Sequence, residues 1–165
     1  MVHRNPWFNV VQRGDYFTIE ENRLQAAVLP IVADKSILLV KVKRPILADS
    51  TIELPAGGAK NGETPVQTAA RELHEETGVL VEDLSRFKRL RPFSVSPRHA
   101  ILGHIFQINL SQQEYDQRGP SDGEVDEIEC LAFAKVKEKI VCGEIYQATS
   151  VAVLSRFLFA HDIGC

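Results

Sequence analysis

Three glutamates close together, Glu72, Glu75 and Glu76, are the residues of this sequence best suited to chemistry. Spacings of three and four residues put them on one side of a helix. On an isolated helix the like-charge pair Glu72–Glu76 costs a few tenths of a kcal/mol, and anions in the last turn oppose the helix dipole. A hard divalent cation would make the cluster favourable, because Mg²⁺ prefers carboxylate, water and phosphate oxygens. The alternative is an ordinary solvated acidic face.

The surrounding residues predict the helix that positions these glutamates. Thr64, Pro65 and Gln67 form a start signal, with a capping hydroxyl, a proline at the first helical position and a capping-box amide. Gly78 supplies the stop, because glycine takes the left-handed conformation that ends many helices. Between these signals, apolar and small residues recur at helical spacing and form a stripe to be buried, at Val66, Ala69, Ala70, Leu73 and Thr77.

The rest of the chain reads mainly as strands. We expect strands at 24–33, 37–45, 51–56, 87–93, 100–110 and 128–136, and a second helix at 148–161. The first two strands form a hairpin around the polar turn 34–36. A mixed sheet with at least two flanking helices follows, which is an α/β or α+β fold. We expect residues 1–165 to form one domain, with residues 1–23 as an N-terminal extension.

Composition narrows the class of partner. The 165 residues, 44% of them hydrophobic, carry a formal net charge of −3, which gives no global basic field for nucleic acid or an anionic membrane. No segment approaches the roughly 18 apolar residues that cross a bilayer, and the N-terminus lacks a signal-peptide run. The three cysteines, Cys130, Cys142 and Cys165, fit neither a disulfide framework nor a zinc site. We expect a cytoplasmic protein, in which a phosphate-bearing ligand needs local cations or metal ions.

The segment that holds the glutamates also matches a longer pattern, G-x5-E-x7-R-E-L-x-E-E-x-G-V. Its defined positions are Gly57, Glu63, Arg71, Glu72, Leu73, Glu75, Glu76, Gly78 and Val79. The pattern resembles the Nudix box, the signature of hydrolases that cleave nucleoside diphosphates linked to another moiety. The resemblance implies an α/β/α sandwich in which the box forms a loop, a helix and a loop.

The resemblance also implies roles for the residues of the box. The metal ligands for Mg²⁺ or Mn²⁺ would be Glu72, Glu75 and Glu76, the carbonyl of Ala56 and, directly or through water, Glu63. The resemblance implies that Glu75, Glu76 and Arg71 form the catalytic group, in which Arg71 would hold the acidic side chains in place. Gly57 and Gly58 would let the backbone approach the metal and the phosphates.

Substrate choice depends on residues outside the box. The run Lys43–Gly57 and the segment around Thr149 resemble the ADP-ribose and ADP-sugar pyrophosphatase branch. Arg44 matches an arginine of that branch, and its guanidinium suits a diphosphate. Pro97 and Arg98 match a Ser-Pro-Gly run of the branch, with Arg98 in place of the glycine. Arg98 therefore either contacts a terminal phosphate or sugar or belongs to an ordinary polar turn.

The general base is expected on a late acidic loop, where the branch places a glutamate. The stretch Ser121–Glu129 supplies Glu124 or Glu127 for this role, ahead of Glu129. The alternative is that this loop is only a solvated acidic surface.

These features predict Mg²⁺-dependent hydrolysis of the diphosphate linkage of ADP-ribose or a nucleotide sugar, giving a nucleoside monophosphate and a sugar phosphate. The alternatives are a dinucleoside polyphosphate hydrolase and a non-catalytic Nudix-like domain that senses a nucleotide metabolite. The full set of metal glutamates favours an enzyme. The resemblance further implies a homodimer. Trp7 and Phe8 of the N-terminal extension either stack on a base or, as aromatic residues more often do, anchor the core or a dimer interface.

Overall fold

Strand β4 (Gln25–Val32) lies at the centre of the main sheet in the computed structural model, which describes residues 1–94, 96–99 and 103–164. It pairs antiparallel with β5 (Ser36–Arg44) and parallel with β9 (His104–Leu110). Further strands complete this sheet: β6 (Asp49–Glu53) and β10 (Glu127–Ala132) pair with β5, β7 (Ala56–Gly58) pairs with β4, and β8 (Lys88–Leu90) pairs with β9. The predicted mixed sheet is therefore present.

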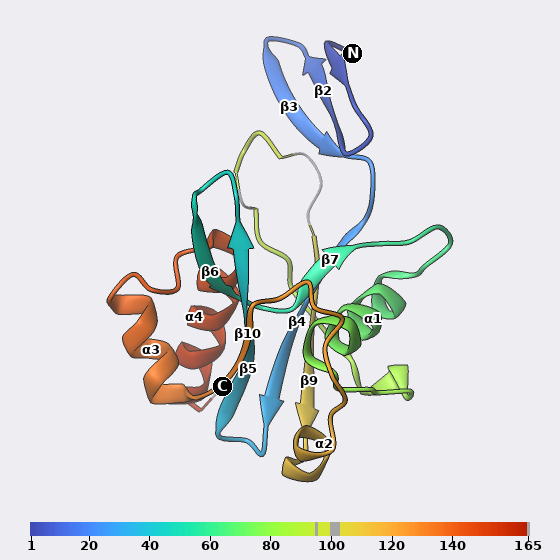
Figure 1. Ribbon diagram of the computed structural model, residues 1–165. Helices are drawn as coiled ribbons and strands as arrows, with labels where there is room; N and C mark the ends of the chain where they lie inside the picture. The colour runs from blue at the N-terminus through green and yellow to red at the C-terminus, as the bar shows by residue number, and fades with distance from the viewer. Residues whose placement is uncertain (95, 100–102, 165) are drawn as a thin grey trace.

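Helices cover both faces of the sheet, because the central strands are apolar on both sides. Alternate residues of β4, Val28 and Val32, pack in one cluster with Ala69 and Leu73 of helix α1 (Pro65–Thr77). The residues between them pack against α3 (Phe133–Val141) and α4 (Ala148–Asp162). Figure 1 shows α1 on one side of the sheet and α3 and α4 on the other. The predicted α/β/α sandwich is confirmed.

Helix α1 begins and ends as its sequence predicts. The hydroxyl of Thr64 accepts from the N–H of Gln67, whose side-chain oxygen accepts in turn from the Thr64 N–H at 2.9 Å. Gly78 ends the helix in the left-handed conformation, with φ at 73°. Of the predicted apolar stripe, Ala69, Leu73 and Thr77 are buried, while Val66 and Ala70 are partly buried.

Two of the predicted strands need correction. Residues 51–56 form the end of β6 and the start of β7, because Pro55 between them has no N–H to give to a sheet. Residues 128–136 are a strand only as far as Ala132, and α3 begins at Phe133. Ala132 provides no side-chain cap, so the sequence contains no local signal for this helix.

The other predicted elements are present, with bounds that differ from the prediction. The strand expected at 87–93 covers only β8, and residues 100–102 of the strand expected at 100–110 lie outside the described residues. The second predicted helix is α4. The segments between strands also hold the 3₁₀ turn η1 (Leu84–Arg86) and the short helix α2 (Gln112–Asp116). Within the described residues, no helix combines the length and the apolar character needed to cross a membrane.

The N-terminal extension forms a small antiparallel sheet of its own. Its strands are β1 (His3–Arg4), β2 (Phe8–Arg13) and β3 (Tyr16–Glu21). In Figure 1 this sheet stands apart from the sandwich, at the top of the view, and the chain runs down from β3 to β4. The Ile19 N–H donates to the Arg98 carbonyl at 2.8 Å, and Ile19 bridges to His99. The extension therefore touches the loop that follows β8.

Candidate functional site

The segment between β6 and α1 lies against the glutamates of the helix. Strand β7 pairs with β4, which holds Ala56 beside α1. The Ala56 N–H donates to Glu76 Oε2 at 3.0 Å. A Cβ atom added at Gly57 would overlap the carboxylate of Glu72, so only glycine lets the backbone come this close. The loop and the helix of the box therefore meet at their acidic groups.

Arg71 binds the carboxylates together. Its Nε and Nη2 donate to the two oxygens of Glu63 at 2.7 and 3.0 Å, and its Nη1 donates to Glu72 at 2.8 Å and Glu75 at 2.7 Å. Nη2 also donates to the Gly58 carbonyl at 2.8 Å. Every N–H group of this guanidinium thus has an acceptor, so Arg71 organises the site and has no donor left for a ligand.

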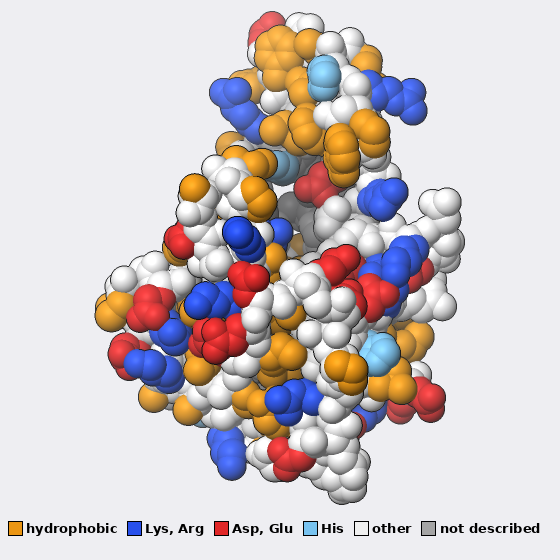
Figure 2. All heavy atoms as spheres, in the orientation of Figure 1, with side chains coloured by type: hydrophobic (Ala, Val, Ile, Leu, Met, Phe, Trp, Pro, Cys, Tyr) orange, Lys and Arg blue, Asp and Glu red, His pale blue; other side chains and the backbone are white. Residues whose placement is uncertain are grey.

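Glu63 and Glu75, the more exposed glutamates of the site, are held in the charged form. The Arg71 guanidinium lowers the pKa of Glu63 to about 2. For Glu75, partial burial acts to raise the pKa, but hydrogen bonds from Lys60 and Arg71 outweigh it and keep the pKa below the ordinary value. Lys60 Nζ lies 2.7 Å from Glu75 Oε1. Figure 2 shows the basic and acidic side chains gathered over the start of α1 and the loop before it.

The inner glutamates, Glu72 and Glu76, are buried, and of the two only Glu72 forms a salt bridge, with Arg71. They are only 8% and 9% exposed, on a helix whose glutamates could have formed a wet surface. Burial raises the pKa of both carboxyls, and it raises that of Glu76 to about 8. The acidic groups are therefore arranged against their own electrostatic preference, which excludes the solvated-face interpretation for these two residues.

The donor set of the cluster fits a hard divalent cation. It consists of carboxylate oxygens beside a glycine-flanked backbone, and Mg²⁺ takes oxygen ligands. A cation would neutralise Glu76, which none of the salt bridges within the described residues reaches. Among the residues that the structure describes, no three acidic, histidine or cysteine side chains converge closely enough to hold a metal ion. At this cluster the carboxylates are instead hydrogen-bonded to Arg71 and to the Ala56 N–H. A bound ion would replace some of these contacts.

The acidic loop before β10 docks on the end of α1. The Gly119 N–H donates to the Gly78 carbonyl at 2.9 Å, and the Asp122 N–H donates to the Glu75 carbonyl at 2.8 Å. The charge of Glu124 adds to the rise in the pKa of Glu72, which shows that this loop carries negative charge to the cluster. Asp122 acts in the same way on Glu76. The structure thus places the loop that carries Glu124, whose side chain is exposed, at the C-terminal end of α1.

Other predicted site residues lie farther out. Glu127 is exposed on β10, where its carboxylate lies 3.8 Å from Lys41 Nζ. Pro97 and Arg98 are exposed and are not part of the cavity wall. Arg98 contributes its carbonyl to the N-terminal sheet rather than its guanidinium to the site. The neighbouring His99 lines the cavity instead.

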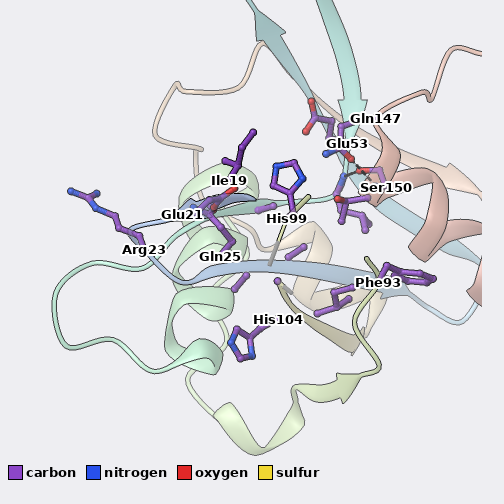
Figure 3. A pocket seen from close by; sticks show the side chains of 18 of the residues that line it. Ile19, Glu21, Arg23, Gln25, Glu53, Phe93, His99, His104, Gln147 and Ser150 are labelled. Atoms are coloured by element: carbon purple, nitrogen blue, oxygen red, sulfur yellow. Dashed lines mark hydrogen bonds between the residues drawn. The ribbon is translucent and has the colours of Figure 1, made fainter. Parts of the chain in front are cut away.

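A cavity of about 430 Å³ opens beside the box. Ala56 and Gly57 form part of its floor, and Arg44 and Glu53 line the wall next to the N-terminal end of α4. Figure 3 shows Glu53 near Gln147 and Ser150 on one side, with Ile19, Glu21, Gln25 and His99 across from them. The cavity is large enough for part of a small ligand, and polar groups from five segments of the chain line it beside Ala56 and Gly57 of the box.

Glu53, Asp122 and His99 are site residues that sequence reasoning missed. Glu53 belongs to the run Lys43–Gly57. In a strand, residues two apart point to the same face, so the sequence could have predicted that Glu53 lies on the same face of β6 as Thr51, which is buried. Asp122 lies in the predicted acidic loop, beside the favoured Glu124. His99 has no sequence signal, since the contact with Ile19 that fixes its place joins distant segments.

Comparison with known families bears on this site directly. Residues 21–148 match the NUDIX domain, a span that contains β4, the whole box and the docked acidic loop. The chain belongs to the Nudix family. The predicted family and its fold are therefore confirmed, and the glutamate cluster on α1 is its Nudix box.

Two curated relatives are similar to most of this Nudix chain. The ADP-ribose pyrophosphatase of Bacillus subtilis (strain 168) is 30% identical over 123 residues, which cover 74% of this chain and 65% of that protein. The methanol dehydrogenase activator of Bacillus methanolicus is 35% identical over 130 residues, which cover 76% of this chain and 66% of that protein. The chain thus spans just under two thirds of the length of each relative.

Proposed function

We propose that this Nudix protein is a Mg²⁺-dependent pyrophosphohydrolase, with Mn²⁺ as an alternative ion. It cleaves the diphosphate linkage of a nucleoside diphosphate joined to another moiety and releases a nucleoside monophosphate. The observation that carries the proposal is the gathering of Glu63, Glu72 and Glu75 around Arg71, with Glu76 held by the N–H of Ala56, which lines the cavity. The similarity to an ADP-ribose pyrophosphatase supports ADP-ribose or a nucleotide sugar as substrate.

The chain would hold the metal on its buried carboxylates. Glu72, Glu75, Glu76 and the Ala56 carbonyl are the proposed ligands, and Glu63 joins them directly or through water. A bound Mg²⁺ supplies charge neutralisation of the diphosphate and activation of water. Arg71 fixes the carboxylates before substrate binds, so little reorganisation remains for the reaction.

Proton transfer falls to the acidic loop. Glu124 is the proposed general base, because its loop docks on α1 and its charge reaches Glu72. Glu127 is the second candidate, although it pairs with Lys41. Comparison of Glu124→Gln with Glu127→Gln decides between them: the base variant loses about 100-fold in kcat or more, and the other keeps most of its activity.

The cavity holds the rest of the substrate. Gly57 and Gly58 let the diphosphate approach the metal, and Arg44 binds it from the wall. Glu21, Gln25 and His99 offer hydrogen-bonding groups to the base or the sugar. Pro97 and Arg98 are proposed to act through the loop that carries His99, since neither side chain lines the cavity.

A product assay tests the activity. The wild-type protein is incubated with Mg²⁺ and ADP-ribose, ADP-glucose, GDP-mannose or diadenosine polyphosphates, and Glu76→Gln serves as the control. We expect nucleoside monophosphate from ADP-ribose or a nucleotide sugar, and at least a 100-fold lower rate from Glu76→Gln. Turnover confined to diadenosine polyphosphates would favour the dinucleoside polyphosphate hydrolase. Tight binding without turnover would favour the metabolite sensor.

We also propose a cytoplasmic homodimer of single-domain chains. The N-terminal sheet exposes Trp7 by 74% and Tyr16 by 77%, and Figure 2 shows hydrophobic side chains gathered on it. Exposed apolar groups of this size favour contact with a second copy. Cys130 and Cys142 are unpaired, which suits a reducing compartment. Sedimentation of the wild type and of Trp7→Ser tests the dimer, and a wild-type monomer would contradict it.

A further inference from the structure

Glu53 is a buried carboxylate that the metal cluster does not use. It lies on β6 and is only 4% exposed. Its two oxygens accept from Arg44 Nε at 2.8 Å and from Arg44 Nη2 at 2.7 Å. The buried hydroxyl of Thr51, two residues earlier on the same strand, donates to Oε1. A buried charge with this many partners has a fixed orientation, and so does the guanidinium that it binds.

Arg44 differs from Arg71 in what its remaining donors can do. Arg71 has an acceptor for every N–H group, whereas Arg44 uses only the edge formed by Nε and Nη2. Among the described residues, no acceptor binds Arg44 Nη1. The Arg44 side chain is 46% exposed and lines the cavity. Its positive charge also opposes the rise in the pKa of Glu76, one of the proposed metal ligands.

We infer that Glu53 is a positioning residue for the diphosphate. It holds Arg44 by one edge, so that the opposite edge of the guanidinium is presented to phosphate oxygens before substrate arrives. The inference rests on the proposed hydrolysis and adds to it a residue that acts through Arg44. Presenting a fixed fork lowers the side-chain entropy lost on binding, which strengthens binding without a new contact to the ligand.

The opposite role for Glu53 makes a different prediction. A carboxylate bound to Arg44 could compete with the diphosphate for the same guanidinium, in which case its removal would tighten substrate binding. Positioning predicts weaker binding after removal. The sign of the change in KM therefore separates the two roles.

The test uses Glu53→Gln in the full chain with ADP-ribose and Mg²⁺. We expect KM to rise about tenfold or more, the range for losing hydrogen bonds to a charged group, while kcat stays within about threefold. Arg44→Lys is a second test that does not remove the buried carboxylate. The lysine keeps the positive charge but lacks the planar guanidinium, so it cannot bind Glu53 on one edge and phosphate on the other, and we expect a similar rise in KM.

The chain offers a matched control pair outside the cavity wall. Arg86 Nη1 and Nη2 donate to the two oxygens of Glu114 at 2.5 and 3.2 Å. Glu114→Gln breaks this pair in the same way, and neither residue lines the cavity. We expect its KM to remain at the wild-type value. A purely structural role of Glu53 would lower the melting temperature and the active fraction and leave KM unchanged.

Three results would overturn the inference. They are an unchanged KM in Glu53→Gln, a lower KM, or a rise in KM that is as large in an Arg44→Ala background as in the wild type. Failure of the proposed function gives a separate result, in which the wild type hydrolyses no nucleoside diphosphate compound. In that case the calorimetric Kd for ADP-ribose replaces KM in the same comparison, and the absence of any binding overturns both proposals.

Discussion

Gly57→Ala tests whether the close approach of the backbone to Glu72 serves catalysis rather than the stability of the fold. The new Cβ would lie 2.6 Å from Glu72 Oε2, and the other two carboxylate atoms would be nearer still. Ordinary contact begins at 3.4 Å, so Oε2 must move by about 0.8 Å and the nearer atoms by more, which is a shift of the carboxylate of about 1 Å. Because the obstructing group is the end of a flexible side chain, the backbone can stay in place. The substitution therefore displaces a proposed metal ligand and little else.

The expected cost falls on catalysis. A displacement of about 1 Å in a catalytic group lowers the rate about 100-fold. The free energy of unfolding falls by only about 1–2 kcal/mol, since the charged hydrogen bond between Glu72 and Arg71 weakens while the alanine restricts the unfolded chain. Steady-state hydrolysis with Mg²⁺ measures the first effect, and urea denaturation measures the second.

The neighbouring glycine provides the comparison. A Cβ at Gly58 would meet its nearest atom, Gln25 Nε2, at 3.4 Å, which is ordinary contact. Gly58→Ala should therefore lose much less activity than Gly57→Ala. Equal losses in the two variants, or full activity in Gly57→Ala, would refute the close approach of this loop to Glu72.

Three further predictions follow from other contacts. Gly78→Ala should lower the free energy of unfolding by about 2 kcal/mol or more, as measured in urea, because φ is 73° and the new Cβ would strike the Gly119 carbonyl. Arg86 lowers the pKa of Glu114 to about 2, so the pair stabilises the fold above the ordinary pKa of 4.5, and this stabilisation is lost as the pH falls towards 2. Glu114→Gln should therefore lower the free energy of unfolding by about 1 kcal/mol at neutral pH and leave it unchanged near pH 2, as measured by urea denaturation. Mg²⁺ at about 100 times its Kd should stabilise the wild type by about 2.7 kcal/mol, and Glu76→Gln much less, in thermal melts.

Local signals were sufficient for the elements that carry the box. Thr64, Gln67 and Gly78 mark the ends of α1 by hydrogen bonds within a few residues, so the sequence predicts them directly. The helix α3 shows the converse, because Ala132 offers no cap and Phe133–Val136 continues the apolar run of β10. The helix at this position is stabilised by tertiary packing, because Val136 is buried in one cluster with residues of α4.

Burial and long-range contacts set the limit for the site. The sequence places Glu72 and Glu76 on one helix side, but their burial depends on β7, which β4 holds in place. The pairing of Arg44 with Glu53 joins two strands, and the docking of Asp122 depends on backbone hydrogen bonds to α1. No local sequence pattern predicts these contacts, because each depends on which strands and loops the tertiary structure brings together.

The cavity wall extends beyond the segment that defines the family. The glutamates of the box all lie within residues 21–148, whereas Ile19, Thr149 and Ser150 of the wall lie outside it at either end. The proposed metal ligands and part of the wall proposed to contact the substrate thus lie in separate stretches of the chain. Exchange of the N-terminal sheet between Nudix proteins could therefore redirect selectivity and leave the bond-breaking chemistry intact.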